Sequence, residues 1–254
     1  MIVRIVGGHG GVSPGFRATS YLIDGKLLID AGSVASGLLI DEQVQIDNIL
    51  ISHPHLDHIA ELAYMSDNCF GLKGKPFEVY ASKETRHGIV THLMNDVIWP
   101  DFSKLPTAEN PTIRFHELVP EKTLILGDYK ILPVSVNHYC DPMGFIVERK
   151  NRAVLFTQDT GPTERIWEIA KQYSNLKAIF TEVSFPNSLA KVAFDSRHHT
   201  PKTIAEEIKK MPPDIPIFLG HLKPNYQAKL YQEIEELDID RFNLLGSDDT
   251  SYVF

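Results

Sequence analysis

The segment 49–58, Ile-Leu-Ile-Ser-His-Pro-His-Leu-Asp-His, joins a short apolar run to four side chains that can bind metals, namely His53, His55, Asp57 and His58. The proline between the first two histidines disfavours a helix, so we expect a tight loop that leaves the end of a buried strand. In such a loop the first two histidines can bind one cation, while the aspartate and the last histidine bind a second. Imidazole and carboxylate groups suit zinc and other borderline divalent metals.

Three later positions repeat this pattern of an apolar run followed by a potential ligand. His138, Asp159 and His221 each follow a short segment that is rich in Val, Ile, Leu and Phe. Each alone is weak evidence, because a histidine at the end of a strand more often packs or caps than binds a metal. Together with the first segment, they complete two sites of three or four ligands, and the carboxylate of Asp159 can bridge them.

Apolar runs that are typical of strands alternate with amphipathic stretches along the whole chain, which predicts a mixed α/β fold. We expect strands at residues 2–6, 20–24, 26–30, 48–52, 77–80, 113–117, 130–137, 144–149, 153–157, 178–181 and 215–219. We expect helices at residues 83–95, 163–173, 201–211 and 227–236. Two halves of this kind predict two mixed β-sheets packed face to face with helices outside, within one domain over residues 1–254. The irregular stretch 100–111 is expected to be a loop between the halves.

The composition is that of an ordinary folded protein, with 254 residues of which 43% are hydrophobic and 23% charged. The formal net charge of −8 should repel a long polyanion, so bulk nucleic acid is a poor expected partner. We see neither a secretory signal pattern nor an apolar run of the roughly 20 residues that a membrane span needs. Because there are only two cysteines, a reduced, cytoplasmic protein is the expectation.

The ligand set resembles that of the metallo-β-lactamase superfamily, and the resemblance covers nearly the whole chain. It implies a four-layer αββα sandwich with one or two metals at one edge. Carried over position by position, His53, His55 and His138 bind one metal, Asp57, His58 and His221 bind the other, and Asp159 bridges them. A bridging carboxylate favours two divalent ions, zinc first and manganese or iron as alternatives. Two metals about 3.5–4 Å apart suit phosphoester hydrolysis, because a hydroxide between them can attack phosphorus.

A narrower resemblance is to the class II 3′,5′-cyclic-nucleotide phosphodiesterases. The segments that carry it are 53–59, 95–102, 182–187, 196–201 and 220–224. Two positions depart from that family: Glu61 stands where Gly or Ser is usual, and Arg197 where Gly is common. The resemblance implies a homodimeric enzyme that hydrolyses cyclic AMP or cyclic GMP, a small substrate, to the 5′-monophosphate.

The expected proton donor is His198, which precedes the last ligand by 23 residues. RNase Z, a tRNA 3′-end nuclease of the same superfamily, has a histidine at a similar place that acts as general acid, and it shares the Asp-Thr-Gly-Pro run at 159–162. The resemblance implies that His198 protonates the leaving 3′ oxygen and that Glu182 orients it. His199 competes for this role. Asp57 is expected to bind a metal and also to accept a hydrogen bond from the nucleophile.

Two other activities remain open on the same fold. One is an RNase Z-like nuclease that acts on RNA 3′ ends, although the short run 71–75 is a poor substitute for the basic arm that seizes tRNA. The other is a thioester hydrolase. A binding protein with a purely structural metal is disfavoured, because structural zinc ions usually have four protein ligands, which are often cysteines.

Several further residues have two open readings. Trp99 and Phe102 could belong to the core or stack on a nucleobase, and Arg17 could contact the phosphate or lie at the surface. The glycine-rich stretch 7–11 is expected to form a tight turn near the site rather than a phosphate-binding loop. The three histidines at 87, 92 and 116 are expected to be surface or core residues, because their spacing is not that of ligands.

Overall fold

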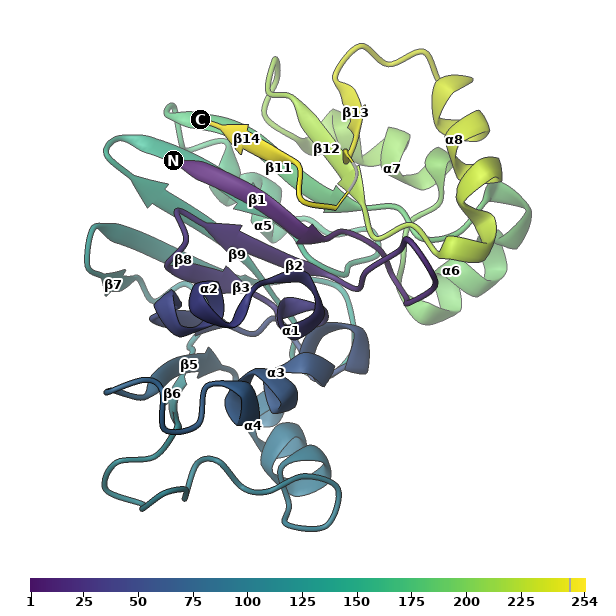
Figure 1. The fold of residues 1–254 in the computed structure, drawn as a ribbon. Helices are drawn as coiled ribbons and strands as arrows, with labels where there is room; N and C mark the ends of the chain where they lie inside the picture. The colour runs from purple at the N-terminus through teal and green to yellow at the C-terminus, as the bar shows by residue number, and fades with distance from the viewer. Residues whose placement is uncertain (247) are drawn as a thin grey trace.

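Two seven-stranded β-sheets lie face to face in the computed structural model, which describes residues 1–246 and 248–254 (Figure 1). The first sheet comprises β1 (Ile2–Gly7), β2 (Ser20–Ile23), β3 (Leu27–Ile29), β4 (Asn48–Leu50), β5 (Phe77–Ala81), β6 (Ile113–Glu117) and β14 (Ser251–Val253), in the order β14-β1-β2-β3-β4-β5-β6. The second comprises β7 (Leu124–Leu126), β8 (Tyr129–Ser135), β9 (Met143–Arg149), β10 (Arg152–Phe156), β11 (Leu176–Glu182), β12 (Ile217–Gly220) and β13 (Phe242–Leu244), in the order β13-β12-β11-β10-β9-β8-β7.

Both sheets are mixed. In the first, β3, β4, β5 and β6 run parallel, while β14, β1, β2 and β3 pair antiparallel. In the second, β7 to β10 pair antiparallel, and β10 to β13 run parallel. The central strands are buried on both faces, which explains why they appear in the sequence as continuous apolar runs rather than alternating ones.

Helices cover the outer face of each sheet, so the layers are αββα (Figure 1). Over the first sheet lie α1 (Val34–Gly37), α2 (Ile40–Gln45), α3 (Leu56–Asn68), α4 (Lys83–Gly88) and the π-helical turn η1 (Ile89–Leu93). Over the second lie α5 (Arg165–Ala170), α6 (Ala190–Ser196), α7 (Pro201–Glu207) and α8 (Gln227–Glu235), with the 3-10 turns η2 (Asn187–Leu189), η3 (Ile208–Lys210) and η4 (Pro224–Tyr226). The predicted sandwich of two mixed sheets is therefore confirmed.

The core between the two sheets is built from side chains of both, including Ile5 and Ile23 from the first and Phe145, Phe156 and Phe180 from the second. Each outer layer has an apolar cluster of its own: α3 contributes to one, and α5, α7 and α8 contribute to the other. Burial of apolar side chains in these three clusters is the main favourable contribution to packing of the four layers. The polar residues of the candidate site lie instead at one edge of the sheets.

The loop predicted after the strand at 48–52 is largely wrong, because the helix α3 begins at Leu56. The proline at 54 prevents a helix only up to its own position, and α3 begins two residues later at Leu56 with His55 as the N-cap residue. The side chains of Ile59, Leu62 and Ala63 lie on the buried face of α3, at helical spacing. Asp57 and His58 therefore project from the first turn of a helix rather than from a loop.

Other differences are smaller. The predicted helix at 83–95 is α4 followed by the π-helical turn, and 163–173 shortens to α5. Three strands of only three residues each, β7, β13 and β14, had no recognisable periodicity in the sequence. Among the described residues, no helix has both the length and the apolar character required to cross a lipid bilayer.

Candidate active site

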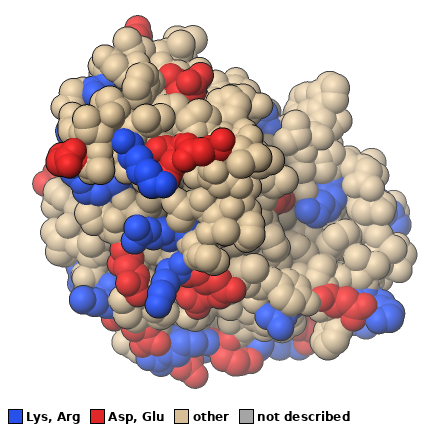
Figure 2. Space-filling model, turned by 90° about the horizontal axis from the view of Figure 1, so that it is seen from below, with Lys and Arg blue, Asp and Glu red and all other residues tan. Residues whose placement is uncertain are grey.

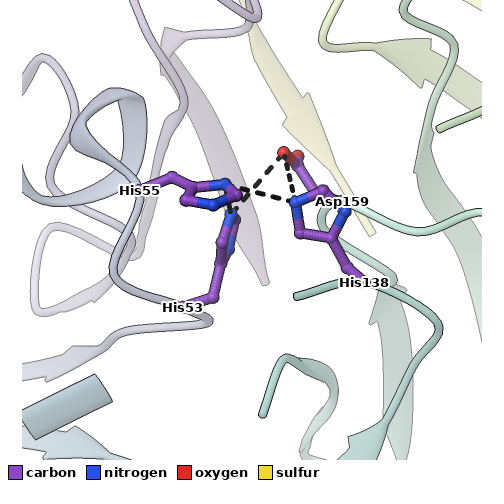
Figure 3. A group of neighbouring side chains, drawn as sticks. All are labelled: His53, His55, His138 and Asp159. Carbon is purple, nitrogen blue, oxygen red and sulfur yellow. Dashed lines mark hydrogen bonds and ion pairs between the residues drawn. The ribbon is translucent and has the colours of Figure 1, made fainter. Parts of the chain in front are cut away.

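Three histidines and an aspartate from the ends of three strands converge at one edge of the two sheets (Figure 3). His53 follows β4, His138 follows β8 and Asp159 follows β10. The Nδ1 atom of His55 lies 2.9 Å from Nε2 of His53 and 3.2 Å from Nε2 of His138. Oδ2 of Asp159 lies 3.7 Å from Nε2 of His53 and 3.9 Å from Nε2 of His138. One cation can lie among these four atoms.

A second group shares Asp159 with the first. It adds Asp57 and His58 from the first turn of α3, and His221, which follows β12. Oδ1 of Asp159 lies 3.0 Å from Nε2 of His221 and 3.3 Å from Nε2 of His58. Oδ2 of Asp57 lies 3.3 Å from Nε2 of His221. The two carboxylate oxygens of Asp159 thus face different groups, which is the arrangement that a bridging ligand requires.

The donor atoms suit cations. Oδ1 of Asp159 is buried and accepts no hydrogen bond from any described residue, which is costly for a polar atom unless a cation binds it. Burial lowers the pKa of His53, and it lowers that of His138 to about 4, so both rings are neutral and able to bind metal. Burial raises the pKa of Asp159, but the neighbouring His221 and His58 lower it by more. The net shift is well below the usual value, so the carboxylate is ionised.

Hydrogen bonds on the side away from the cluster orient four of the five histidine rings. The bonds are His53 Nδ1 to Ser52 Oγ at 3.0 Å, His58 Nδ1 to Asp30 Oδ2 at 2.6 Å, His138 Nδ1 to the Arg197 carbonyl at 3.1 Å, and His221 Nδ1 to Ser184 Oγ at 3.0 Å. Each bond leaves the other ring nitrogen directed at the cluster, as in protein metal sites. Asp30 also accepts hydrogen bonds from Ser52 and Gln158, which hold it in place.

The expected proton donor lies beside the cluster. Nδ1 of His198 is 2.6 Å from Oε1 of Glu182, the last residue of β11, and the His198 ring centre is 4.8 Å from that of His138. Burial lowers the pKa of His198, but the Glu182 carboxylate outweighs burial, and the net shift is upward. Glu182 in turn accepts hydrogen bonds from Ser184 Oγ and the Thr160 amide. Glu182 therefore favours the protonated form of the His198 imidazole, and it contacts Nδ1 of the ring rather than Nε2.

The competing histidine is placed differently. His199 has no exposed surface, and its Nδ1 lies 3.0 Å from Oγ1 of Thr203 in the first turn of α7. A side chain so enclosed has no path to a substrate. Arg197, which immediately precedes His198, has φ of +56°, a left-handed conformation that glycine adopts most readily. The Arg197 guanidinium donates to the His138 carbonyl at 2.7 Å.

The residues with two open readings fall as follows. Phe102 is 3% exposed within the apolar cluster under α3, so it belongs to the core and base stacking by Phe102 is wrong. The Trp99 indole is half-buried and donates to the Ala63 carbonyl at 3.1 Å, which also places it against α3. Arg17 pairs with two aspartates, at 248 and 249, and not with the cluster.

The glycine-rich turn lies against the cluster, as expected. A Cβ atom on Gly10 would lie 2.6 Å from the His221 ring, so only glycine permits this close approach. Glu61, the other departure from the family pattern, accepts hydrogen bonds from the backbone amides of Ala35 and Ser36 at 2.7 and 2.8 Å. It therefore fixes α1 against α3 and does not contact the cluster.

Metal binding should raise the melting temperature, Tm, of the folded protein. Ions that bind only the folded state add about 4 kcal/mol when their concentration is about a thousand times Kd. For a chain of this size, each kcal/mol raises Tm by about 2–4 °C, so chelation should lower Tm by about 8–16 °C. Scanning calorimetry with EDTA, and again after excess zinc or manganese is restored, tests this. An unchanged Tm would contradict a metal centre here.

Residues 26–221 match the family profile described as a β-lactamase superfamily domain. Two curated proteins are similar over most of the chain. One is from Yersinia pestis and is named a probable 3′,5′-cyclic-nucleotide phosphodiesterase. It is 27% identical to this chain, and the alignment covers 89% of this chain and 79% of the relative's sequence. The other, named a 3′,5′-cyclic-nucleotide phosphodiesterase, from Aliivibrio fischeri, is 24% identical and covers 92% and 75%.

Solved structures agree on the fold. Unliganded yeast PDE1 matches 97% of this chain and 98% of its own, with a TM-score of 0.82 and 15% identity. Human short-form tRNase Z matches 100% and 99%, with a TM-score of 0.73 and 18% identity. At such identities these likenesses show the fold alone. Together with the profile match and the buried histidine and aspartate cluster, they show that this chain belongs to the metallo-β-lactamase superfamily of hydrolases.

Proposed function

We propose that this protein hydrolyses a 3′,5′-cyclic nucleotide, cyclic AMP or cyclic GMP, to the 5′-monophosphate. The observation that carries the proposal is the His198–Glu182 pair beside two ligand groups, since it provides a proton donor next to a site for cations. A ribose 3′ oxygen is a poor leaving group and needs such a donor. The names of the two curated relatives support a cyclic nucleotide as the substrate.

In this proposal the two ligand groups hold two divalent ions, zinc first and manganese or iron as alternatives. When bound, the ions would lower the pKa of water and offset the negative charge that grows on the phosphate oxygens. His53, His55 and His138 would hold one ion, Asp57, His58 and His221 would hold the other, and Asp159 belongs to both groups. In this proposal Asp57 would also accept a hydrogen bond from the attacking water.

The proposed reaction balances once exchange of protons with solvent is included. The attacking water gives one proton to solvent as its oxygen bonds to phosphorus, the bond between phosphorus and the 3′ oxygen breaks, and His198 regains a proton from solvent after the product has formed. His198 gives its Nε2 proton to the departing 3′ oxygen, while its Nδ1–H remains bonded to Glu182. The product is a 5′-monophosphate with a free 3′ hydroxyl. Glu182 positions His198 and favours its protonated form, and does not itself contact the substrate.

Hydrolysis of cyclic AMP is the direct test. Metal-replete protein should form 5′-AMP, and not 3′-AMP, at a rate that EDTA abolishes and added metal restores; chromatography of the product identifies the bond that is cleaved. Intact cyclic AMP and cyclic GMP beside hydrolysis of bis-p-nitrophenyl phosphate would contradict the proposed substrate and retain the metal site. RNA 3′ ends would then be the next substrates.

An RNA substrate is the less favoured alternative. On the face drawn in Figure 2, Lys and Arg are interspersed with Asp and Glu and form no continuous basic tract. A small, singly charged substrate tolerates the net charge of −8 better than tRNA does. A cytoplasmic location, a homodimer and a single domain over residues 1–254 remain predictions.

A further inference from the structure

A hollow of about 560 Å³ opens directly beside the candidate metal centre. His55 lines it, and the Nδ1 atom of the same residue lies 2.9 Å from Nε2 of His53 in the centre. The hollow therefore adjoins the candidate metal centre through His55. A second hollow, of about 460 Å³, is lined by Tyr139, Phe194 and Arg197 among others, but by none of the proposed ligands.

The lining of the first hollow is mostly apolar with a few polar groups. Leu56 and Ile98 are 66% and 62% exposed, so they offer apolar surface to a ligand in this hollow. Glu84, His87 and His92 add hydrogen-bonding groups to the same walls. Apolar walls with few polar groups suit a flat aromatic ligand whose faces are apolar and whose edges carry donors and acceptors.

The backbone of this wall is irregular and tied to the metal-binding segment. After α4 the chain continues as the π-helical turn η1, and π-helical turns occur frequently at functional sites. Gly88, where α4 ends, lies against Pro54: a Cβ atom on Gly88 would be 3.0 Å from the Pro54 Cβ. The wall that carries His87 and His92 is thus packed on the segment that carries His53 and His55.

We propose that the hollow lined by His55, His92 and Ile98 binds the nucleobase of the cyclic nucleotide while its phosphate lies at the metal centre. The base is the occupant because the hollow adjoins the centre and has the lining that a base requires. This inference rests on the proposed function. It goes beyond it by assigning residues that distinguish a nucleotide from a simple phosphodiester.

The test compares cyclic AMP with 1-deoxyribose 3,5-cyclic phosphate, which has hydrogen in place of the base. The variant is His92→Ala with Ile98→Ala. Both side chains are exposed, and His92 makes no side-chain hydrogen bond with any described residue, so folding should survive. The ratio of kcat/KM for cyclic AMP to that for the baseless compound should fall about tenfold, the scale of base-stacking contributions. Phe194→Ala, in the other hollow, is the control and should not change the ratio.

The outcomes separate the two proposals. If the wild type hydrolyses neither cyclic AMP nor cyclic GMP, the proposed function is wrong, and this inference is wrong with it. If cyclic AMP is hydrolysed but the double variant keeps the wild-type ratio, or Phe194→Ala lowers it, the base does not bind in this hollow and the proposed function stands.

Inhibition by adenosine provides a second readout that does not depend on chemistry at phosphorus. Adenosine has the base and sugar but no phosphate, so it should compete with cyclic AMP in the wild type while ribose should not. The double variant should weaken this inhibition by about the same tenfold. Equal inhibition of wild type and double variant would overturn the inference.

Discussion

His198→Ala should lower kcat for cyclic AMP by about 10²–10⁴-fold, the usual contribution of a positioned general acid. The ribose 3′ oxygen leaves as a strongly basic alkoxide unless it receives a proton. The same substitution should lower kcat for bis-p-nitrophenyl phosphate by less than about tenfold, because p-nitrophenolate leaves readily without a proton. Steady-state kinetics with both substrates measures the difference.

Two further variants make this experiment specific. Glu182→Gln keeps a hydrogen-bonding partner for His198 but removes the charge that raises its pKa, so it should show the same leaving-group dependence with a smaller loss. His199→Asn is the matched control: this histidine is buried against Thr203, so kcat for both substrates should stay near the wild-type value. Equal losses on both substrates in His198→Ala would show that His198 is not the proton donor.

Asp159→Asn should abolish metal binding at one or both groups and lower kcat by at least about 100-fold, whatever the leaving group. The carboxylate presents one oxygen to each group, and the amide retains only one oxygen and no charge. Its –NH₂ group would face ring nitrogens on one side and could not bind a cation. Metal analysis of the purified variant, by mass spectrometry after dialysis, should give fewer than two ions per chain.

Comparing Asp159→Asn with His198→Ala on the two substrates distinguishes loss of metal from loss of the proton donor. Asp159→Asn should affect cyclic AMP and bis-p-nitrophenyl phosphate alike, while His198→Ala should separate them. Asp195→Asn is a suitable control, since this carboxylate is exposed and pairs only with Lys191 in its own helix among the described residues. Two bound ions and normal activity in Asp159→Asn would contradict the bridging role.

The grouping of these side chains could be predicted from sequence, because several of them lie shortly after a strand. His138, Asp159 and His221 lie within three residues of the end of a buried strand, and the ends of strands in packed sheets meet at one edge. Strand recognition needs only a few consecutive apolar residues. The short segment at 53–58 contains the other four candidate metal-binding side chains within six residues.

Local patterns also explain the main error. The proline at 54 disfavours a helix only up to its own position, so it does not prevent α3 from beginning at Leu56. The spacing of Ile59, Leu62 and Ala63 was the signal that could have revealed α3. Because Asp57 and His58 lie in the first turn of that helix, they are held more rigidly than loop residues would be.

Apolar patterns and residue types along short stretches were enough to predict two packed sheets with helices outside and to identify side chains that could bind metals. The orientation of those side chains depends on contacts between distant parts of the chain: Asp30 binds His58 across 28 residues, and Ser184 binds His221 across 37. The tertiary structure also separated His198, beside the cluster, from the enclosed His199. A hydrogen bond depends on distance and angle in space, and neighbours in space can be remote along the chain.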